Sequence, residues 1–124
     1  LVHLEGRVLY GEVYGWVADL RYGHRPGHVS FVAFDIFDPA TGRFHDYDEF
    51  TRAVEALGIP LAPVLYRGPW DPLRIAEWTE GPSRLFPGHI REGAVVRPAR
   101  ERFDERIGRV ILKQHGEGYL LGGR

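Results

Sequence analysis

Glu92 and Lys113 are the two side chains whose types and spacing suggest chemistry on a phosphate. Glu92 begins the stretch EGAVVRP at residues 92–98, and Lys113, the only lysine in the chain, follows 21 positions later. A carboxylate can hold a divalent metal, and Gly93 would let the backbone come close to a ligand. An ammonium group can neutralise phosphate oxygens. Together these residues predict a site for a metal-bound polyphosphate.

Short strands are expected to position both side chains. Residues 94–97 favour a strand that follows Glu92, and residues 109–113 favour a second strand that ends at Lys113. The charged segment 99–106 joins them. Further strands are predicted at three places upstream: residues 8–14, 29–37 and 63–66. A hairpin turn at residues 38–42 follows the second of these, and Gly11 in the first marks a bulge or a close approach to a ligand.

Two helices are predicted between the strands. Asp46 or Asp48 can cap the first helix, and Gly58 ends it. Its apolar residues recur on one face: Phe50, Val54 and Leu57. The second helix is expected from Asp71 to about Trp78, with a proline in its first turn. These elements predict an α+β domain of mainly antiparallel sheets with inserted helices.

Composition limits the possible functions. The 124 residues suit one domain, and the formal net charge of -1 gives no overall basic field that would attract nucleic acid. A polyanion would therefore have to meet a local arginine cluster. The absence of cysteine excludes disulfides and thiolate metal sites. Without a signal peptide or a membrane-length apolar run, a soluble cytoplasmic protein with no membrane partner is expected.

Four more residues could contact a nucleotide. Glu12 could accept hydrogen bonds from a ribose hydroxyl, and Phe34 could stack on a purine base if it faces a pocket. Asp35 lies inside an apolar strand, so it must find a partner such as a cationic side chain or a metal-bound water. Arg97 could contact a phosphate. Each also has a structural alternative, as a surface carboxylate, a core aromatic residue or a solvated cation.

In sequence order, four segments resemble the later motifs of covalent nucleotidyltransferases, and most closely those of the ATP-dependent RNA ligases. The segments are YGEVYG at residues 10–15, FVAFDI at 31–36, EGAVVRP at 92–98, and Leu112-Lys113. The resemblance implies that residues 1–124 form the larger C-terminal part of a nucleotidyltransferase (ATP-grasp-like ligase) domain, a partial adenylyltransferase domain. It also implies ATP and Mg²⁺ or Mn²⁺ as cofactors and nicked or broken RNA ends as the partner.

The resemblance assigns roles to particular residues. Glu12 matches a glutamate that contacts the nucleoside sugar or helps to hold metal, and Phe34 matches an aromatic residue that stacks on the base. Glu92 matches the acidic residue of metal-assisted nucleotidyl transfer. Lys113 matches the first lysine of a Lys-x-Lys motif, which neutralises the α-phosphate. The second lysine is replaced by His115, which is only partly charged at neutral pH.

Asp35 and Arg97 complete the predicted nucleotide site. Magnesium takes only one or two carboxylates, so Glu92 with Glu12 or Asp35 is chemically sufficient to hold it. Arg97 would add a phosphate contact.

The nucleophile of covalent nucleotidyl transfer is missing from the chain. The family supplies it as the lysine of a Lys-x-Asp-Gly motif, which the sequence lacks. The chain also begins without methionine, inside an apolar alternating stretch. The nucleophile is therefore expected upstream of Leu1, in a further segment of the same protein, and the isolated chain is expected to be inactive as a ligase.

Other readings stay open. Seven arginines could instead form a non-catalytic RNA-binding module: Arg84, Arg91, Arg97, Arg100, Arg102, Arg106 and Arg109. A DNA ligase or capping-enzyme fragment is a further alternative. His28-Val29-Ser30 has no second copy, as a two-histidine phosphoesterase would need, and the Arg-Pro-Gly between His24 and His28 disfavours a helical metal site. No P-loop and no Gly-x-Ser-x-Gly motif is present.

Overall fold

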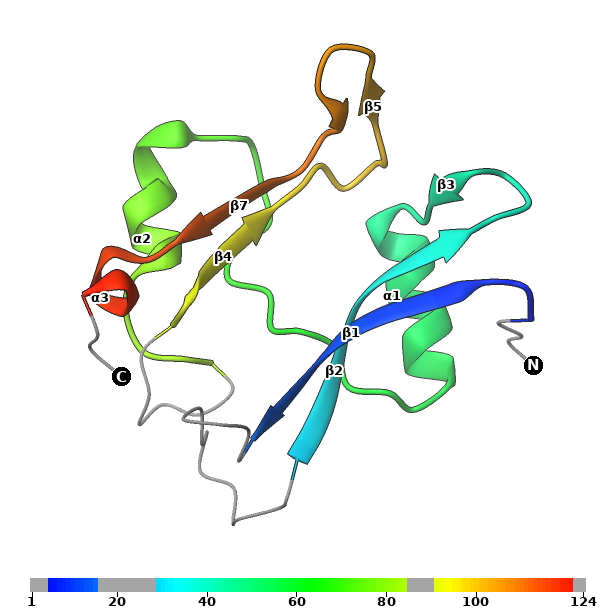
Figure 1. Ribbon diagram of the computed structural model, residues 1–124, viewed down its shortest axis with the longest axis horizontal. Coiled ribbons are helices and arrows are strands. Elements are labelled where there is room, and N and C mark those ends of the chain that lie inside the picture. The colour runs from blue at the N-terminus through cyan, green and yellow to red at the C-terminus, as the bar shows by residue number, and fades with distance from the viewer. Residues whose placement is uncertain (1–4, 16–28, 85–90, 122–124) are drawn as a thin grey trace.

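The computed structural model describes residues 5–15, 29–84 and 91–121. His24 and His28 lie outside these ranges. In the described part, strands alternate with short helices, which confirms the predicted α+β class (Figure 1). The strands are β1 (Val8–Gly15), β2 (Val29–Asp38), β3 (Arg43–Phe44), β4 (Gly93–Val96), β5 (Phe103–Asp104), β6 (Gly108–Arg109) and β7 (Leu112–His115). The helices are α1 (Tyr47–Ala56), η1 (Pro72–Arg74, a 3₁₀ helix), α2 (Ile75–Thr79) and α3 (Glu117–Leu120).

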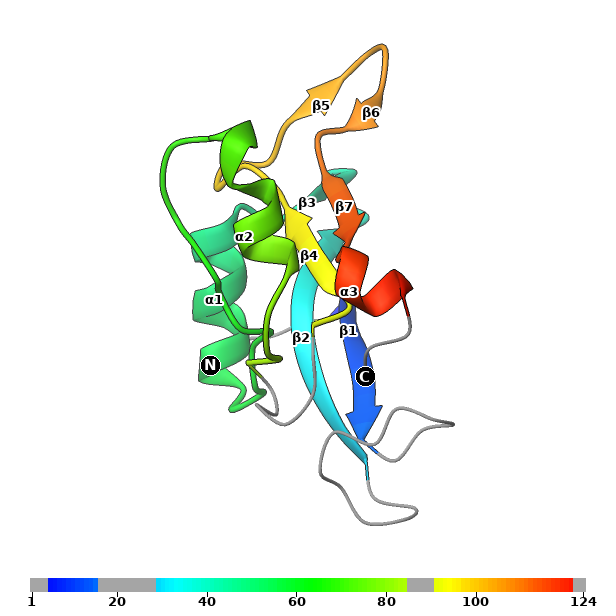
Figure 2. The same ribbon diagram turned by 90° about the vertical axis from the view of Figure 1, so that its left-hand side faces the viewer.

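The described strands pair into three antiparallel sheets: β1-β2-β3, β4-β7 and β5-β6. Turning the molecule shows β5 and β6 projecting from one end of β4 and β7, while α1 and α2 lie along the same side (Figure 2). None of the helices in the described part of the chain has the length and apolar content that a bilayer crossing requires.

Helix α1 and strand β2 enclose the hydrophobic core. The buried residues of this core are Ala33, Ile36, Phe50, Ala53 and Val54. Asp46 is the N-cap of α1, and its backbone N–H donates to Oε1 of Glu49 at 3.1 Å, which completes a capping box. Gly58 follows the helix with φ 69°, a conformation that glycine adopts at little cost. The predicted start and end of this helix are therefore confirmed.

A bulge interrupts the pairing of β1 with β2. Tyr10 pairs with Asp35 and Gly11 with Ala33, so Phe34 is the extra residue of β2. A Cβ atom on Gly11 would collide with the ring of Phe31, which explains the glycine. The bulge changes the alternation of β2, since Ala33 and Ile36 both reach the core while Phe34 remains 42% exposed.

Residues 63–66 do not form the predicted strand. The chain instead makes a single parallel bridge between Leu61 and Ala33, in which Ala33 donates to Pro60 and Ala62 donates to Ala33, both at 2.8 Å. Pro60 and Pro63 have no backbone N–H, so a ladder cannot extend across them.

The C-terminal strands also differ from the prediction. The predicted strand at residues 109–113 is divided into β6 and β7, because Val110 donates to the carbonyl of Arg102 and closes the small β5–β6 hairpin before β7 begins. β4 starts one residue earlier than predicted, at Gly93, and pairs with β7.

Candidate nucleotide and metal site

Glu92 lies at the start of β4, where Arg91 fixes the chain. The Arg91 side chain donates to the carbonyls of Trp78 (2.7 Å) and Pro82 (3.1 Å), near the C-terminal end of α2, and its backbone N–H donates to Gly81 at 2.8 Å. A cation suits a helix end that presents carbonyls. The Glu92 carbonyl then accepts from the N–H of Gly116 at 2.9 Å. Both neighbours thus fix the backbone that carries the Glu92 carboxylate.

Gly93 has a different purpose from the one predicted. A Cβ atom at this position would collide with the backbone of Gln114 and His115 on β7. Gly93 is therefore required for close approach of two strands, and the expectation that it serves close approach to a ligand is not needed to explain it.

Lys113 lies on β7, which pairs with β4, the strand that begins directly after Glu92. Its Cα partner on β4 is Val95, and the partner of His115 is Gly93. Since side chains alternate along a strand, Lys113 and His115 share one face of β7, and both are exposed. The fold therefore places Lys113 within the β4–β7 sheet and Glu92 at its end, directly before β4, and gives His115 the same orientation as Lys113.

Glu12 and Phe34 occupy the other sheet. Glu12 is exposed on β1 and its Cα partner on β2 is Val32. Phe34 is the bulged residue of β2, with an exposed ring available for stacking. The fold thus places these two residues on neighbouring strands.

Asp35 and Arg97 do not lie on an open surface. Asp35 is only 2% exposed. Its Oδ1 lies 2.8 Å from Nη1 of Arg97, at an angle outside that of a hydrogen bond, and its Oδ2 lies 2.5 Å from Nη1 of Arg109. The guanidinium of Arg97 also lies 5.3 Å from the ring centre of Tyr47. Asp35 therefore has a cationic partner, one of the two kinds of partner that the sequence predicted. A nucleotide contact by Asp35 or Arg97 stays a prediction.

Arg109 was predicted only as one of seven RNA-binding arginines, and the sequence did not indicate its contacts with Asp35 and Glu101. Its side chain donates to both carboxylate oxygens of Glu101 at 3.0–3.1 Å, and its guanidinium lies 3.7 Å from the ring centre of Phe44. Burial alone would lower the pKa of Arg109, but the hydrogen bonds to Asp35 and Glu101 outweigh it and hold the pKa above its ordinary value. The one signal in the sequence was an aspartate inside an apolar strand, which requires a cation but does not say which.

The four residues form what we call the charged junction: Asp35, Arg97, Glu101 and Arg109. Arg97 immediately follows β4, and Arg109 is the last residue of β6, shortly before β7. Two more contacts lie beside it, because Tyr47 donates to the carbonyl of Ala99 at 2.8 Å and Glu101 donates to Oδ1 of Asp46 at 2.6 Å. The charged junction therefore connects β2 and α1 to the strands that carry Glu92 and Lys113.

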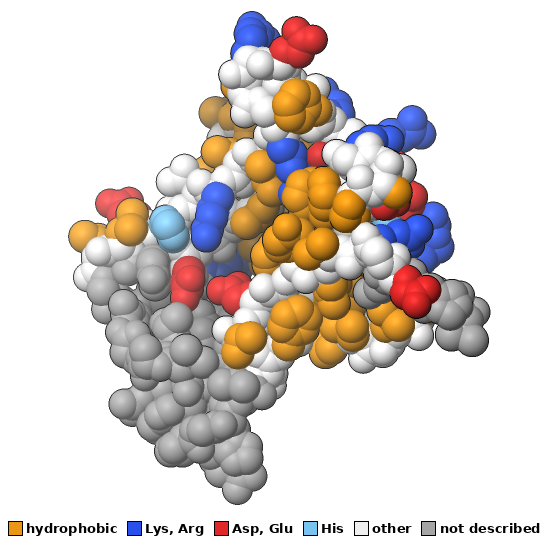
Figure 3. Space-filling view, turned by 45° about the vertical axis from the view of Figure 1, so that its right-hand side comes forward, with side chains coloured by type: hydrophobic (Ala, Val, Ile, Leu, Met, Phe, Trp, Pro, Cys, Tyr) orange, Lys and Arg blue, Asp and Glu red, His pale blue; other side chains and the backbone are white. Residues whose placement is uncertain are grey.

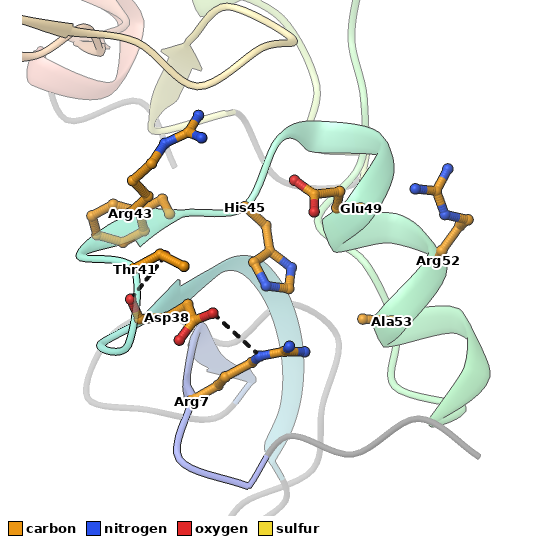
Figure 4. Close-up of a pocket in the computed structure, with 9 residues that line it drawn as sticks. Arg7, Asp38, Thr41, Arg43, His45, Glu49, Arg52 and Ala53 are labelled. Atoms are coloured by element: carbon orange, nitrogen blue, oxygen red, sulfur yellow. Dashed lines mark hydrogen bonds and ion pairs between the residues drawn. The ribbon is translucent and has the colours of Figure 1, made fainter.

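A separate open pocket of about 510 Å³ lies between the start of β1, the β2–β3 turn and α1 (Figure 4). None of the predicted site residues lines it. Arg7 and His45 point into it, whereas the side chains of Arg43 and Arg52 extend away from its centre. Within the pocket, Asp38 forms an ion pair with Arg7 at 3.8 Å. It has no chemical relation to the predicted site.

Comparison with known proteins identifies the chain. The model of the RNA ligase family matches residues 2–115. The chain belongs to the RNA ligase family. Among curated proteins, none matches it.

Solved structures of an RNA ligase from Naegleria gruberi have the same fold. A variant with AMP and manganese has a TM-score of 0.75 at 22% identity, a variant with ATP and manganese has 0.73 at 23%, and the enzyme with pyrophosphate has 0.70 at 22%. Each match covers 93% of this chain and 34% of the other chain. The chain therefore spans about a third of the length of these ligases.

One face of the described part of the chain combines charged and apolar side chains. Figure 3 shows acidic, basic and histidine side chains close together there, at the edge of a wide hydrophobic area. Within residues 5–15, 29–84 and 91–121, no group of three or more histidine, aspartate and glutamate side chains could hold a metal alone.

Proposed function

We propose that the chain is the ATP- and metal-binding part of an ATP-dependent RNA ligase. The observation that carries the proposal is the pairing of β4 with β7, which places Lys113 on one strand and Glu92 directly before the other, in a chain that matches the RNA ligase family over residues 2–115. The reaction would transfer AMP to an RNA 5′-phosphate, and a 3′-hydroxyl would then attack that phosphate, form the phosphodiester bond and release AMP.

Phe34 and Glu12 would bind the nucleoside. A base that stacks on the exposed ring of Phe34 needs no sequence-specific partner, since every base has an aromatic face. The Glu12 carboxylate would accept a hydrogen bond from the ribose.

Glu92 and Lys113 would bind the phosphates. The donor set fits a magnesium or manganese ion, because such an ion takes one or two carboxylates and fills its other positions with phosphate oxygens and water. Glu92, with Glu12, would supply those carboxylates, and the metal would neutralise charge on the phosphates. Lys113 would stabilise the charge that grows on the α-phosphate oxygens in the transition state. His115, on the same face of β7, would add charge only when protonated.

The nucleophilic lysine would come from a segment outside the 124 residues, since Lys113 is the only lysine and already has another role. The amine of that lysine would attack the α-phosphorus and release pyrophosphate. The AMP would then pass to the RNA end.

Labelled ATP tests these assignments. With magnesium and [α-³²P]ATP, the 124-residue chain should bind ATP reversibly but form no acid-labile covalent adduct. The complete ligase, with its Lys-x-Asp-Gly segment, should form the adduct, and Glu92→Gln should reduce it by at least a hundredfold. Glu105→Gln is the matched control, because it removes the same charge from an exposed carboxylate. Near-normal adenylation by Glu92→Gln would contradict the role of Glu92, and covalent labelling of the chain alone would contradict the missing nucleophile.

A non-catalytic RNA-binding module is the second candidate. Three of its seven arginines are already held by partners within the chain: Arg91, Arg97 and Arg109. The family match also favours RNA ligation over DNA ligation or capping. Competition between ATP and GTP separates a ligase from a capping enzyme, because only the latter would prefer GTP.

A further inference from the structure

The β5–β6 hairpin carries an exposed surface that the proposed nucleotide site does not use. Both views show the hairpin projecting beyond the rest of the described chain (Figures 1 and 2). We call residues 100–107 the hairpin tip. Its two large apolar side chains are unusually exposed, Phe103 at 76% and Ile107 at 71%. A projecting hairpin that keeps an aromatic ring in water has no stabilising reason to do so within the chain.

Three exposed arginines belong to the same segment as this aromatic ring. Arg100, Arg102 and Arg106 are all exposed, and the side chain of Arg106 reaches 89% exposure. The two arginines of the charged junction are close to these three in sequence but are far less exposed. The Arg97 and Arg109 side chains are only 15% and 18% exposed.

The acidic residues of the same segment are mostly occupied by local contacts. Glu101 is held by Arg109 and its side chain is 11% exposed. Asp104 accepts the backbone N–H of Arg106 at 2.8 Å and has an ion-pair contact with the Arg106 side chain at 3.5 Å. Glu105 is the one acidic residue of the tip whose side chain is exposed and makes no such local contact. With Glu101 held by Arg109, the solvent-accessible charges of the tip are three arginines against Asp104 and Glu105, which leaves a small excess of positive charge.

We propose that the hairpin tip binds an unpaired RNA strand, with Phe103 stacked on a base and the three arginines on the phosphates. Unpaired bases stack on exposed aromatic rings, and arginine contacts phosphate through paired N–H groups. The inference rests on the proposed function in one respect, the identity of the nucleic acid as RNA. It adds a contact surface that is separate from the ATP site.

Fluorescence anisotropy with the 124-residue chain and a short labelled single-stranded RNA tests the proposal. Replacing Arg100, Arg102 and Arg106 by Gln should weaken binding at least tenfold at about 0.1 M salt and reduce the slope of log K against log salt by about 0.7 for each arginine. Phe103→Ala should weaken binding about tenfold without changing that slope, and Phe103→Tyr should restore it.

Matched controls separate this surface from general attraction. Arg52→Gln removes the same charge from an exposed position on α1, and Leu73→Ala shortens an apolar side chain that is 93% exposed elsewhere. Both should bind RNA as the unchanged chain does. An affinity of the triple variant within twofold of the unchanged chain would overturn the proposal. So would an Arg52→Gln variant that loses as much affinity as each arginine of the tip, or duplex RNA that competes as well as single-stranded RNA. Binding of ATP by the triple variant should be unchanged. If the chain bound RNA through the tip but bound no ATP, the proposed function would fail and this inference would stand.

Discussion

The arginines between residues 97 and 109 belong to two regions with opposite surroundings. In the charged junction, Arg97 and Arg109 are buried against Asp35, Glu101 and aromatic rings. At the hairpin tip, the arginines extend into solvent beside Phe103. The two regions are adjacent in sequence and contain the same residue type, so the density of arginine in a sequence does not reveal its use. Burial separates these arginines into two groups. The buried ones have a structural role, and the exposed ones can bind a partner.

The same contrast explains how the site is held. The apolar core of α1 and β2 packs without directional contacts, whereas an ion pair fixes distance and angle. In the described part of the chain, no backbone ladder joins the β1-β2-β3 sheet to the β4-β7 sheet. The charged junction therefore has the geometry to set the position of Glu92 and Lys113 relative to Phe34.

Removing the central carboxylate should have the largest effect on the folded state. Asp35→Ala leaves Arg97 without its ion-pair partner and Arg109 with Glu101 alone, and removing one partner of a buried ion pair costs about 3–5 kcal/mol. Urea unfolding of the chain measures the loss. Glu105→Ala, on the exposed side of the comparison, should change the free energy of unfolding by less than about 0.5 kcal/mol. If the two variants were equally stable, the junction would not be the structural region that we describe.

Arg109→Lys should have an intermediate effect. Lysine keeps the charge but cannot hold Asp35 and Glu101 at once, as the guanidinium does. A loss of about 1.5–3 kcal/mol is expected, the range for a hydrogen bond to a charged group. Thermal melting of the chain at neutral pH measures it, and an unchanged midpoint would show that the fork of Arg109 is dispensable.

Arg102→Gln should leave stability within about 0.5 kcal/mol of the unchanged chain, because the side chain is exposed. The same urea titration checks this value. A loss comparable to that of Arg109→Lys would place Arg102 among the structural arginines and remove the distinction between the two regions.

Acid should affect the hairpin only slightly. The N–H of Arg106, and then its side chain, hold the pKa of Asp104 below its ordinary value of 3.8. A lowered pKa in the folded state gives a stabilisation that is complete above pH 3.8 and is lost as the pH falls through the lowered pKa. Asp104→Asn should therefore lower the stability slightly at neutral pH, where this stabilisation is complete, and flatten the acid limb of the stability–pH curve. An effect at pH 7 as large as that of Asp35→Ala would contradict the account.

The fold was predictable where local chemistry decides it. The Asp46 cap and Gly58 delimit α1, and apolar runs indicate β1, β2 and β4. The strand at residues 63–66 was wrong because proline prevents a ladder there, and the division of β6 from β7 depends on a hydrogen bond to Arg102. Such contacts between distant residues leave no local pattern.

For the site, residue type predicted more than position did. A buried-strand aspartate at position 35 indicated a cation, yet the partners, Arg97 and Arg109, are far along the chain. Gly93 was correctly noted as a place of close approach, but the approaching group is β7. The roles of Glu12, Phe34, Glu92 and Lys113 stay predictions, since they depend on a ligand.

Paramagnetic NMR tests the central claim, that Glu92 and Lys113 bind one metal–polyphosphate. MnATP added to the ¹⁵N-labelled chain should broaden the backbone signals of Glu92 and Lys113 first, because relaxation by Mn²⁺ falls steeply with distance. The signals of α1 and of the hairpin tip should remain sharp. Strong broadening at the hairpin tip or at α1, with Glu92 and Lys113 unaffected, would contradict the account.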